Sequence, residues 1–230
     1  GSPVACRGDA TTLFLAHIDS VHQSPGAVDN AAAVAILLEL ARSSQARDLC
    51  LGFPIGEEAG LIGSRSLAAD WQGPPLQLVV SLDLIGTGTP TGIDLNESWG
   101  TSELTWLTSN SDIDIPILHR IFGRALPQWR SDHGPFAANG LLAFQIKTRG
   151  ESPVFPRYHQ RDDTAVHPPS IELTAAALEN LARAGPPTRG APDPALPIMG
   201  WVLPGTAVWS IIGLGFVSGI PGITRLRNTL

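Results

Sequence analysis

The most constraining feature of this sequence is that three short apolar segments each end in histidine or carboxylate side chains. Apolar runs of about five residues are typical of strands that are buried on both faces of a parallel sheet. The carboxyl ends of such strands open into one crevice, where ligands bind. We therefore expect the polar residues that follow the three segments to lie close together: His17 and Asp19, Glu57 and Glu58, and Asp83.

Segments with helical character alternate with the predicted strands. Residues 29–44 are rich in alanine and leucine and contain no helix breaker, so they predict a buried helix, and residues 60–71 predict a shorter one. A further strand is expected at 141–146 and a helix at 170–184, with Ser170 as its N-cap. This alternation predicts an α/β fold with a mostly parallel central sheet flanked by helices on both faces.

The chain of 230 residues is long enough for one α/β domain and an appendage. We assign the domain to residues 1–184. Residues 185–197 are rich in proline and are expected to form a linker without regular structure. An apolar C-terminal segment at 198–224 and a short basic tail at 225–230 follow the linker.

The apolar segment 198–224 carries no charged residue and is long enough to cross a bilayer, which takes about 20 residues. Trp201 and Trp209 are suited to membrane interfaces, and the arginines after the segment favour a cytoplasmic C-terminus. The alternative is a tail that packs on the domain or on a second subunit. We expect an extracytoplasmic protein, either secreted or anchored by this segment with the α/β domain outside.

Charge and cysteine content exclude two classes of site. The formal net charge is −6 and the basic residues are dispersed, which argues against a nucleic-acid partner. Cys6 and Cys50 are too few for a zinc cluster made of cysteines. Both lie in predicted strands, and we expect free thiols in the core rather than a disulfide.

The adjacent carboxylates of Glu57 and Glu58 repel each other, and a bound cation would offset that repulsion. Asp29, at the start of a predicted helix, and His159, in a polar loop after the last strand, are expected at the same edge of the sheet. Histidines with carboxylates suit zinc or a similar divalent ion, and a shared carboxylate can hold two ions about 3.5 to 4 Å apart. Taken singly, Asp29 also fits a helix N-cap and His17 a buried core histidine. The complete set favours a metal site.

Six motifs occur along the chain: AHIDS, SPGAVDNAAAVAILLELAR, GEEAGLIGS, SLDLIG, SDHGPF and YHQRDDT. In their order and approximate spacing they resemble the co-catalytic di-zinc aminopeptidase family, which includes secreted bacterial leucyl aminopeptidases and glutamate carboxypeptidase. The resemblance covers residues 4–184. It implies the three-layer α/β sandwich of zinc peptidases, peptide substrates that lose their N-terminal residue, and two zinc ions, for which cobalt or manganese can substitute.

The resemblance also implies a ligand set for each zinc ion. One ion would be held by His17, Asp29 and Asp83. The other would be held by Asp29, Glu58 and His159, so that Asp29 bridges the two ions.

Three further acidic residues match family positions around these ligands. Glu57 would be the general base that activates the bridging water and later protonates the leaving amine. Asp19, a candidate catalytic residue, would orient the imidazole of His17. Asp163 would support the loop that carries His159 from outside the ligand set.

The motif SDHGPF matches a family element beside the substrate cleft. Asp132 and His133 are therefore candidates for substrate binding, together with Tyr158, although the first two also fit a structural role in bracing a loop. Two positions depart from the family pattern: Ala33 replaces a usual glycine, and Gln128 stands where some members have a carbonyl-polarising tyrosine. The helical region usual before the first strand is absent as well, so we expect part of the outer layer to be missing.

Two other functions fit parts of the pattern. A glutaminyl-cyclase-like acyltransferase resembles this family in fold but uses a single zinc ion. Receptor relatives of the family that have lost ligands do not catalyse. The full ligand set and Glu57 favour the peptidase, and metal count and product analysis distinguish it from the cyclase.

Overall fold

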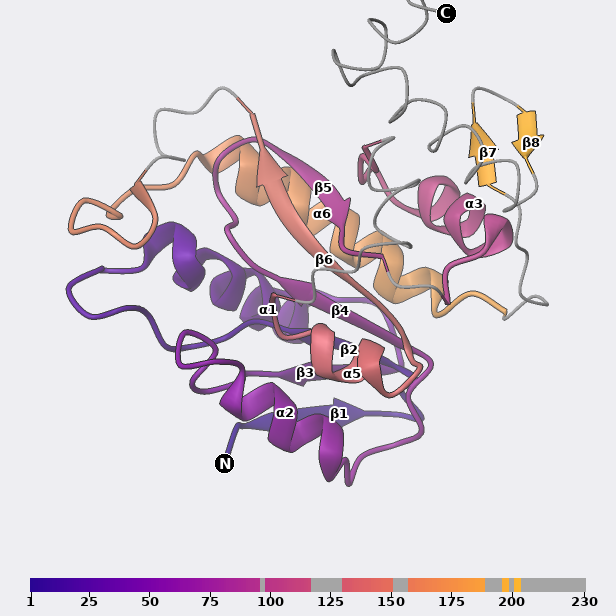
Figure 1. Cartoon of the computed structure of the whole chain (residues 1–230), viewed down its shortest axis with the longest axis horizontal. Coiled ribbons are helices and arrows are strands. Elements are labelled where there is room, and N and C mark those ends of the chain that lie inside the picture. The colour runs from indigo at the N-terminus through magenta and orange to yellow at the C-terminus, as the bar shows by residue number, and fades with distance from the viewer. Residues whose placement is uncertain (96–97, 117–129, 151–156, 189–195, 199–200, 204–230) are drawn as a thin grey trace, which may run out of the picture.

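The computed structural model describes residues 1–95, 98–116, 130–150, 157–188, 196–198 and 201–203. Most of these residues form one unit, in which helices lie on both faces of a central sheet (Figure 1). The α/β class predicted from the alternation of segments is thereby confirmed.

The sheet has six strands in the order β1-β3-β2-β4-β6-β5. The strands are β1 Val4–Arg7, β2 Thr12–Leu15, β3 Leu49–Gly52, β4 Leu78–Leu82, β5 Thr89–Ile93 and β6 Leu142–Arg149. The central strands β3, β2, β4 and β6 run parallel, whereas β1 and β5 pair antiparallel at the two edges. The sheet is thus mostly parallel, as predicted. Strand β5 was not expected, because its sequence TPTGI has little of the apolar character of a strand.

The central strands are apolar because both faces of the sheet are covered. All four residues of β2 are buried, and they alternate between two cores: Phe14 belongs to one, and Leu13 and Leu15 belong to the other. Burial on both sides explains why these strands are continuous apolar runs rather than alternations of apolar and polar residues.

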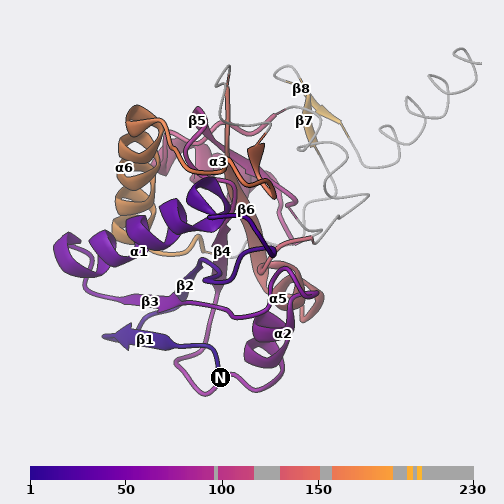
Figure 2. The same cartoon turned by 90° about the vertical axis from the view of Figure 1, so that its left-hand side faces the viewer.

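The helices form the two outer layers. Figure 2 shows α1 (Ala32–Ser43) and α6 (Pro168–Ala184) on one face of the sheet, with α2 (Ile62–Ala69) and α5 (Gly134–Ala138) on the other. The first pair contributes to the larger hydrophobic core and the second pair to the smaller one. A further helix, α3 (Thr101–Asn110), contacts α6. The result is a three-layer sandwich.

Three helices begin at residues other than the expected ones, and α2 begins at Ile62 rather than at Gly60. Helix α1 begins at Ala32, and Asp29 lies before it in a distorted turn with φ −124° and ψ 78°. Helix α6 begins at Pro168, which suits a first helical turn because proline lacks the N–H that has no partner there. Ser170 is therefore inside the helix, and the predicted N-cap is wrong. Its hydroxyl instead accepts a hydrogen bond from the N–H of Gly88, at 3.1 Å.

Cys6 and Cys50 form a disulfide, so the expectation of free thiols is wrong. The two cysteines are direct partners in the antiparallel pairing of β1 with β3. They are 44 positions apart in the chain, and β2 lies between their strands in the sequence. Only the order of strands in the sheet brings the two sulfur atoms together.

Two short strands beyond the sandwich, β7 (Leu196–Ile198) and β8 (Trp201–Leu203), pair antiparallel. Strand β7 begins inside the range expected to be an irregular linker, and the hairpin includes the first residues of the segment expected to cross a membrane. Of the helices in the described residues, none has both the length and the apolar character of a membrane span. Residues 204–224 lie outside the described part of the chain, so membrane anchoring stays a prediction.

Candidate metal centre

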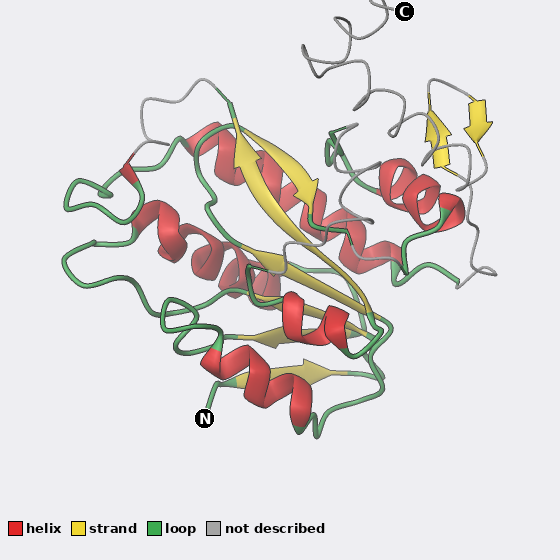
Figure 3. Cartoon of the chain, viewed as in Figure 1, coloured by secondary structure: helices red, strands yellow, loops and turns green. Residues whose placement is uncertain are grey.

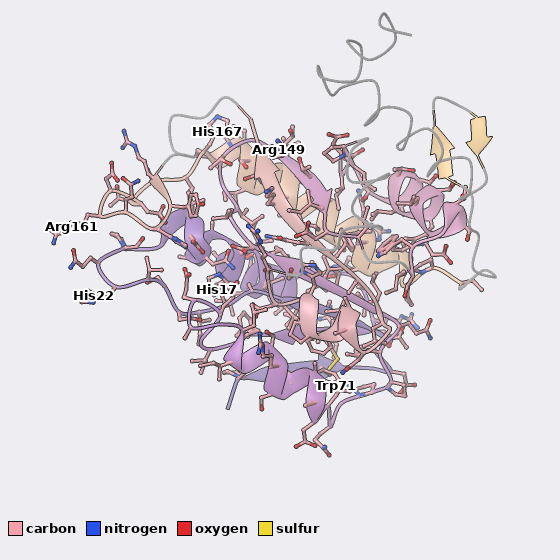
Figure 4. All side chains as sticks on the ribbon, in the orientation of Figure 1. His17, His22, Trp71, Arg149, Arg161 and His167 are labelled. Carbon is pink, nitrogen blue, oxygen red and sulfur yellow. A yellow bond between two sulfur atoms is a disulfide. The ribbon has the colours of Figure 1, made fainter. Side chains whose placement is uncertain are left out.

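The five predicted metal ligands lie at one end of the sheet. His17 is two residues beyond β2, Glu58 is in the loop after β3, and Asp83 directly follows β4. Asp29 lies in the turn before α1, and His159 in the loop between β6 and α6. Figure 3 shows the loops after β2 and β3 and the loop that precedes α6 at the same end of the sheet, and Figure 4 labels His17 among them. The expectation of a shared edge is met.

Each oxygen of the Asp29 carboxylate faces a different imidazole. Its Oδ1 lies 3.2 Å from Nε2 of His17, and its Oδ2 lies 3.0 Å from Nε2 of His159. Nε2 of His17 is also 3.7 Å from Oδ1 of Asp83, and Nε2 of His159 is 3.2 Å from Oε2 of Glu58. The ligand atoms within each of two sets lie within 4.8 Å of one another: His17, Asp29 and Asp83, and Asp29, Glu58 and His159.

The atoms of both sets fit divalent metal ions. Nε2 of His17 and Oε1 of Glu58 are buried and make no hydrogen bond. A buried polar atom without a partner costs free energy, and coordination to a metal ion would remove that cost. Imidazole nitrogens and carboxylate oxygens are donors that zinc accepts.

The electrostatics of the site also favour a cation. The side chain of His17 is 1% exposed, and that of Asp29 is 5% exposed. Burial lowers the pKa of His17, but the adjacent carboxylates of Asp29 and Asp83 outweigh burial and raise the pKa to about 12. The carboxylates would therefore hold a proton on this imidazole at neutral pH, which shows how strongly they attract positive charge.

Asp19 makes a contact that differs from the expected one. Its carboxylate accepts hydrogen bonds from the backbone N–H groups of Gly56, Glu57 and Glu58, at 2.9, 3.2 and 3.1 Å. The Nδ1 of His17 instead lies 3.0 Å from the carbonyl oxygen of Asp19 and 3.8 Å from its Oδ1. Asp19 thus orients His17 through its backbone, while its carboxylate holds the turn that carries the two glutamates.

The turn of Glu57 depends on the residue before it. Gly56 has a φ of +80°, and a Cβ at this position would lie 3.2 Å from Cβ of Ile62. Glu57 is half-buried and lines the pocket described below. Burial, together with the Asp83 carboxylate, raises the pKa of Glu57 to about 8. A carboxylate with a raised pKa is suited to accept and release a proton near neutral pH.

Asp163 connects the loop of His159 to Asp29. Its buried carboxylate accepts hydrogen bonds from the backbone N–H groups of Val28, at 2.9 Å, and Asp29, at 3.2 Å. Its carbonyl oxygen accepts a third from Ala27, at 3.1 Å. Asp163 therefore braces more than its own loop, because it also fixes the backbone of the shared ligand.

A pocket of about 490 Å³ opens over the metal centre. Its lining includes four of the acidic residues already described, together with Tyr158 and His159. The ring of Tyr158 packs against the imidazole of His159, with ring centroids 4.6 Å apart. Of the predicted substrate-binding residues, Tyr158 is thus the one that lies at the pocket wall.

Asp132 and His133 lie inside the protein rather than in the pocket. They are 1% and 0% exposed, and neither lines the pocket. Nδ1 of His133 lies 3.2 Å from the hydroxyl of Ser81 in β4, and the carbonyl oxygen of His133 accepts hydrogen bonds from the first turn of α5. Burial raises the pKa of Asp132 to about 7 and lowers that of His133 to about 4. This arrangement fits the alternative of a structural brace, and the substrate contact expected of these two residues stays a prediction.

Four polar residues of the pocket were not expected from the sequence: Asp94, Arg130, Gln145 and Lys147. Gln145 and Lys147 alternate with apolar residues in β6, which extends three residues beyond the predicted strand. This alternation was the sequence signal that could have identified Gln145 and Lys147 as pocket residues. A strand that passes a pocket needs no apolar side chains on the face toward the pocket. Ala33 is fully buried in α1, and Gln128 lies outside the described residues.

Comparison with known proteins places this fold and site in a family. The model of peptidase family M28 matches residues 4–184. Aminopeptidase YwaD of Bacillus subtilis (strain 168) is 30% identical over 169 residues, which are 66% of this chain and 35% of that protein. The chain therefore spans only 35% of the length of this curated relative.

Solved structures share the fold at lower sequence identity. The zinc aminopeptidase BSAP from Bacillus subtilis is 20% identical with a TM-score of 0.58, over 77% of this chain and 47% of that one. Porphyromonas gingivalis glutaminyl cyclase is 15% identical with a TM-score of 0.56, over 76% of this chain and 74% of that one. The resemblance inferred from the six motifs is confirmed by the family match over residues 4–184: the chain belongs to peptidase family M28.

Proposed function

We propose that this protein is a di-zinc metallo-aminopeptidase that removes N-terminal residues from peptides. The observation that carries the proposal is the carboxylate of Asp29, whose two oxygens lie 3.2 and 3.0 Å from the Nε2 atoms of two different imidazoles, those of His17 and His159. Membership of peptidase family M28 and the likeness to aminopeptidases support it. His17 and Asp83 would hold one ion, Glu58 and His159 the other, and Asp29 both.

The residues around the ions have distinct tasks in this proposal. When bound, the two ions would polarise the scissile carbonyl and acidify a water molecule, and cobalt or manganese can substitute for zinc in such a site. Glu57 accepts a proton from the attacking water and passes it to the leaving amine. Asp19 keeps Glu57 in place, because its carboxylate binds the backbone N–H groups on both sides of that residue's Cα. Tyr158 lies where a substrate would contact the pocket wall.

Substitution of Glu57, the proposed general base, distinguishes a loss of catalytic rate from a loss of metal binding. We expect Glu57→Gln to keep two zinc ions per chain and to lose about 10²- to 10⁴-fold in rate, because the amide cannot accept the proton. The measurement is hydrolysis of aminoacyl anilides with free and with acetylated amino groups, together with zinc content. Glu172→Gln, an exposed substitution in α6, is the matched control and should keep full activity.

Two results would count against this function. Equal cleavage of free and acetylated substrates would exclude an aminopeptidase, because the free amine would then not be recognised. Full activity of Glu57→Gln would remove Glu57 from the reaction. Binding of two zinc ions without hydrolysis of any anilide would leave the ligand assignment standing and point to another reaction or to binding alone.

A glutaminyl cyclase is the second candidate. One observation favours it: the chain spans 74% of the Porphyromonas gingivalis glutaminyl cyclase but only 47% of BSAP. A cyclase would release ammonia from a peptide with N-terminal glutamine and leave a pyroglutamyl end, whereas an aminopeptidase would release free glutamine. Mass analysis of a Gln-initiated peptide, with the zinc count, decides between the two.

We also propose that the protein works outside the cytoplasm. The Cys6–Cys50 disulfide supports this, since disulfides persist in oxidising compartments and are rare in the cytosol. Fractionation of cells that express the full-length protein, with thiol labelling before and after reduction, tests the proposal. Cytoplasmic protein with both thiols reduced would contradict it.

A further inference from the structure

The chain contains a single lysine, and it lies in the pocket over the metal centre. Lys147 is half-buried on β6 and is one of the residues that line the pocket. Among the described residues it has no hydrogen-bond partner and no ion-pair partner within 4 Å. A half-buried ammonium group without a direct partner loses hydration, and the carboxylates of Asp94 and Asp83 offset that loss only in part. Its position therefore points to a ligand.

The register of β6 places this lysine close to the metal centre. Gln145 donates a hydrogen bond from Nε2 to Oδ2 of Asp83, at 3.1 Å. Lys147 is two residues further along the same strand, so its side chain leaves the same face of the sheet about 7 Å beyond Gln145. If a substrate binds beside Asp83, Lys147 would therefore be able to reach the substrate atoms that follow the bound group.

Beyond the metal ligands, the described lining of the pocket carries two positive side chains and two negative ones, of which Glu57 is one. Lys147 and Arg130 are positive, and Asp94 is negative. Arg130 is exposed and, like Lys147, has no hydrogen-bond or ion-pair partner among the described residues. Burial and the nearby Arg149 lower the pKa of Lys147, and Asp94 and Asp83 only partly oppose this. A substrate carboxylate would supply the direct partner that Lys147 lacks among the described residues.

Apolar side chains also line this pocket. Leu61, Leu84 and Ile93 line the same pocket. A short methylene chain that ends in a carboxylate suits such surroundings, because the methylenes contact the apolar groups while the carboxylate meets the ammonium group. A large apolar side chain would instead bury Lys147 further without supplying a partner.

We propose that this pocket binds a substrate carboxylate, that of an acidic side chain on the N-terminal residue, and that Lys147 is its specificity residue. The proposal rests on the aminopeptidase function proposed above, and it names the substrate class of that site.

The first experiment compares two substrates that differ only in charge. Glutamyl anilide should be cleaved about 10- to 100-fold faster than glutaminyl anilide, measured as kcat/KM, because hydrogen bonds to charged groups are the stronger ones. Lys147→Met should remove the preference. Arg149→Met is the matched control, since it removes a cation from the same face of β6 outside the pocket, at the position labelled in Figure 4. It should keep the preference.

A second pair of substrates distinguishes the source of the carboxylate. Leu-Ala and Leu-Ala amide differ only in the charge at the peptide's C-terminus. A preference for Leu-Ala that Lys147→Met removes, with equal cleavage of the glutamyl and glutaminyl anilides, would show that the pocket binds a terminal carboxylate. That result would overturn an acidic side chain as the ligand.

A spectroscopic measurement makes the test independent of turnover. Reductive methylation with ¹³C-formaldehyde labels Lys147 and the N-terminal amine, and the methylated lysine keeps its charge. In the zinc-loaded protein, titration with L-glutamate should shift the Lys147 methyl signal, and titration with L-glutamine should leave it nearly unchanged. Equal shifts with both amino acids would overturn the proposal.

The two readouts separate failure of this inference from failure of the proposed function. Cleavage of leucyl anilide together with equal rates for the glutamyl and glutaminyl anilides would overturn the specificity and leave the aminopeptidase intact. No cleavage of any anilide, with a glutamate-specific shift of Lys147, would overturn the aminopeptidase and leave a carboxylate site beside the metal centre.

Discussion

The two halves of the candidate metal centre differ in how they are held. In the half made by His17 and Asp83, the side chains are 1% and 14% exposed, and both residues follow central strands of the sheet. In the half made by Glu58 and His159, they are 14% and 46% exposed, and both residues lie in loops. Asp29 is common to both halves. One half is therefore part of the rigid core, and the other is attached to it.

This difference shows which contacts fix the positions of the ligand side chains in each half. The strand ends fix the buried half directly, and Gln145 adds a hydrogen bond to Asp83. The exposed half depends on two carboxylates outside the ligand set: Asp19 holds the turn of Glu58, and Asp163 ties the loop of His159 to the shared ligand. Such supporting contacts typically change metal affinity about 10- to 100-fold.

The largest expected effect comes from removing one histidine of each half. His17→Ala should destabilise the metal-free protein by about 3–5 kcal/mol, because it removes the buried cation that faces the carboxylates of Asp29 and Asp83. His159→Ala should cost less than about 1 kcal/mol, because its imidazole is largely exposed. Urea unfolding in the presence of a chelator measures both.

The comparison between these two variants contains its own control, since both lose one imidazole that faces Asp29. Equal losses of stability would show that the two halves are equally embedded in the fold, and the distinction drawn here would fail.

A smaller effect is expected in the pH dependence of metal binding. The carboxylates raise the pKa of His17 to about 12, against the effect of burial, so this imidazole is protonated at neutral pH when no metal is bound. Zinc at the buried half must displace that proton, and its affinity should rise about tenfold for each unit of pH between 6.5 and the raised pKa. Calorimetric titration in buffers of different ionisation enthalpy counts the released proton.

The same titration on the two histidine variants shows which imidazole releases the proton when zinc binds. His159→Ala should keep the release, and His17→Ala should lose it. Zinc binding to the unmodified protein without proton release at pH 7 would mean that His17 is already neutral, and the electrostatic description of the buried half would be wrong.

The smallest effect is expected from the brace of the exposed half. Asp163→Asn should lower zinc affinity at the Glu58 and His159 half about tenfold, because an amide offers one acceptor where the carboxylate binds two N–H groups. Resolved zinc binding steps in calorimetry measure the change. Asp162→Asn, at an exposed neighbour whose carboxylate pairs with Arg157 at 3.5 Å, is the matched control. Equal weakening of both binding steps would show that Asp163 acts on the whole centre rather than on one half.

Several features of the site were predictable from the sequence because they depend on strand ends. An apolar run that stops at a histidine or carboxylate places that residue at the edge of a parallel sheet, which is how His17, Glu58 and Asp83 were found. The ordered motifs added Asp29 and His159. The polar face of β6 was missed because only the fold shows that this strand passes the pocket.

The positions that depend on pairing between distant segments were not predictable in the same way. The disulfide requires β1 and β3 to be neighbours, and nothing in the local sequence around Cys6 and Cys50 specifies that order. Asp132 and His133 matched a substrate-cleft motif, yet the packing of α5 against the sheet buries them. The carboxylate of Asp19 matched a position expected to orient His17, yet it binds the turn after a different strand.

The sequence by itself determined the fold class, the family and the chemical identity of the ligands, because periodicity and residue type are local properties of the chain. The tertiary structure decided which atoms meet: the two oxygens of Asp29, the carboxylate of Asp19 under the glutamate turn, and Lys147 beside the metal centre. These depend on the order and register of strands far apart in the chain. A register shift of one residue would turn every side chain of a strand to the other face, and a strand that is apolar on both faces, such as β2, has no polar face to specify its register.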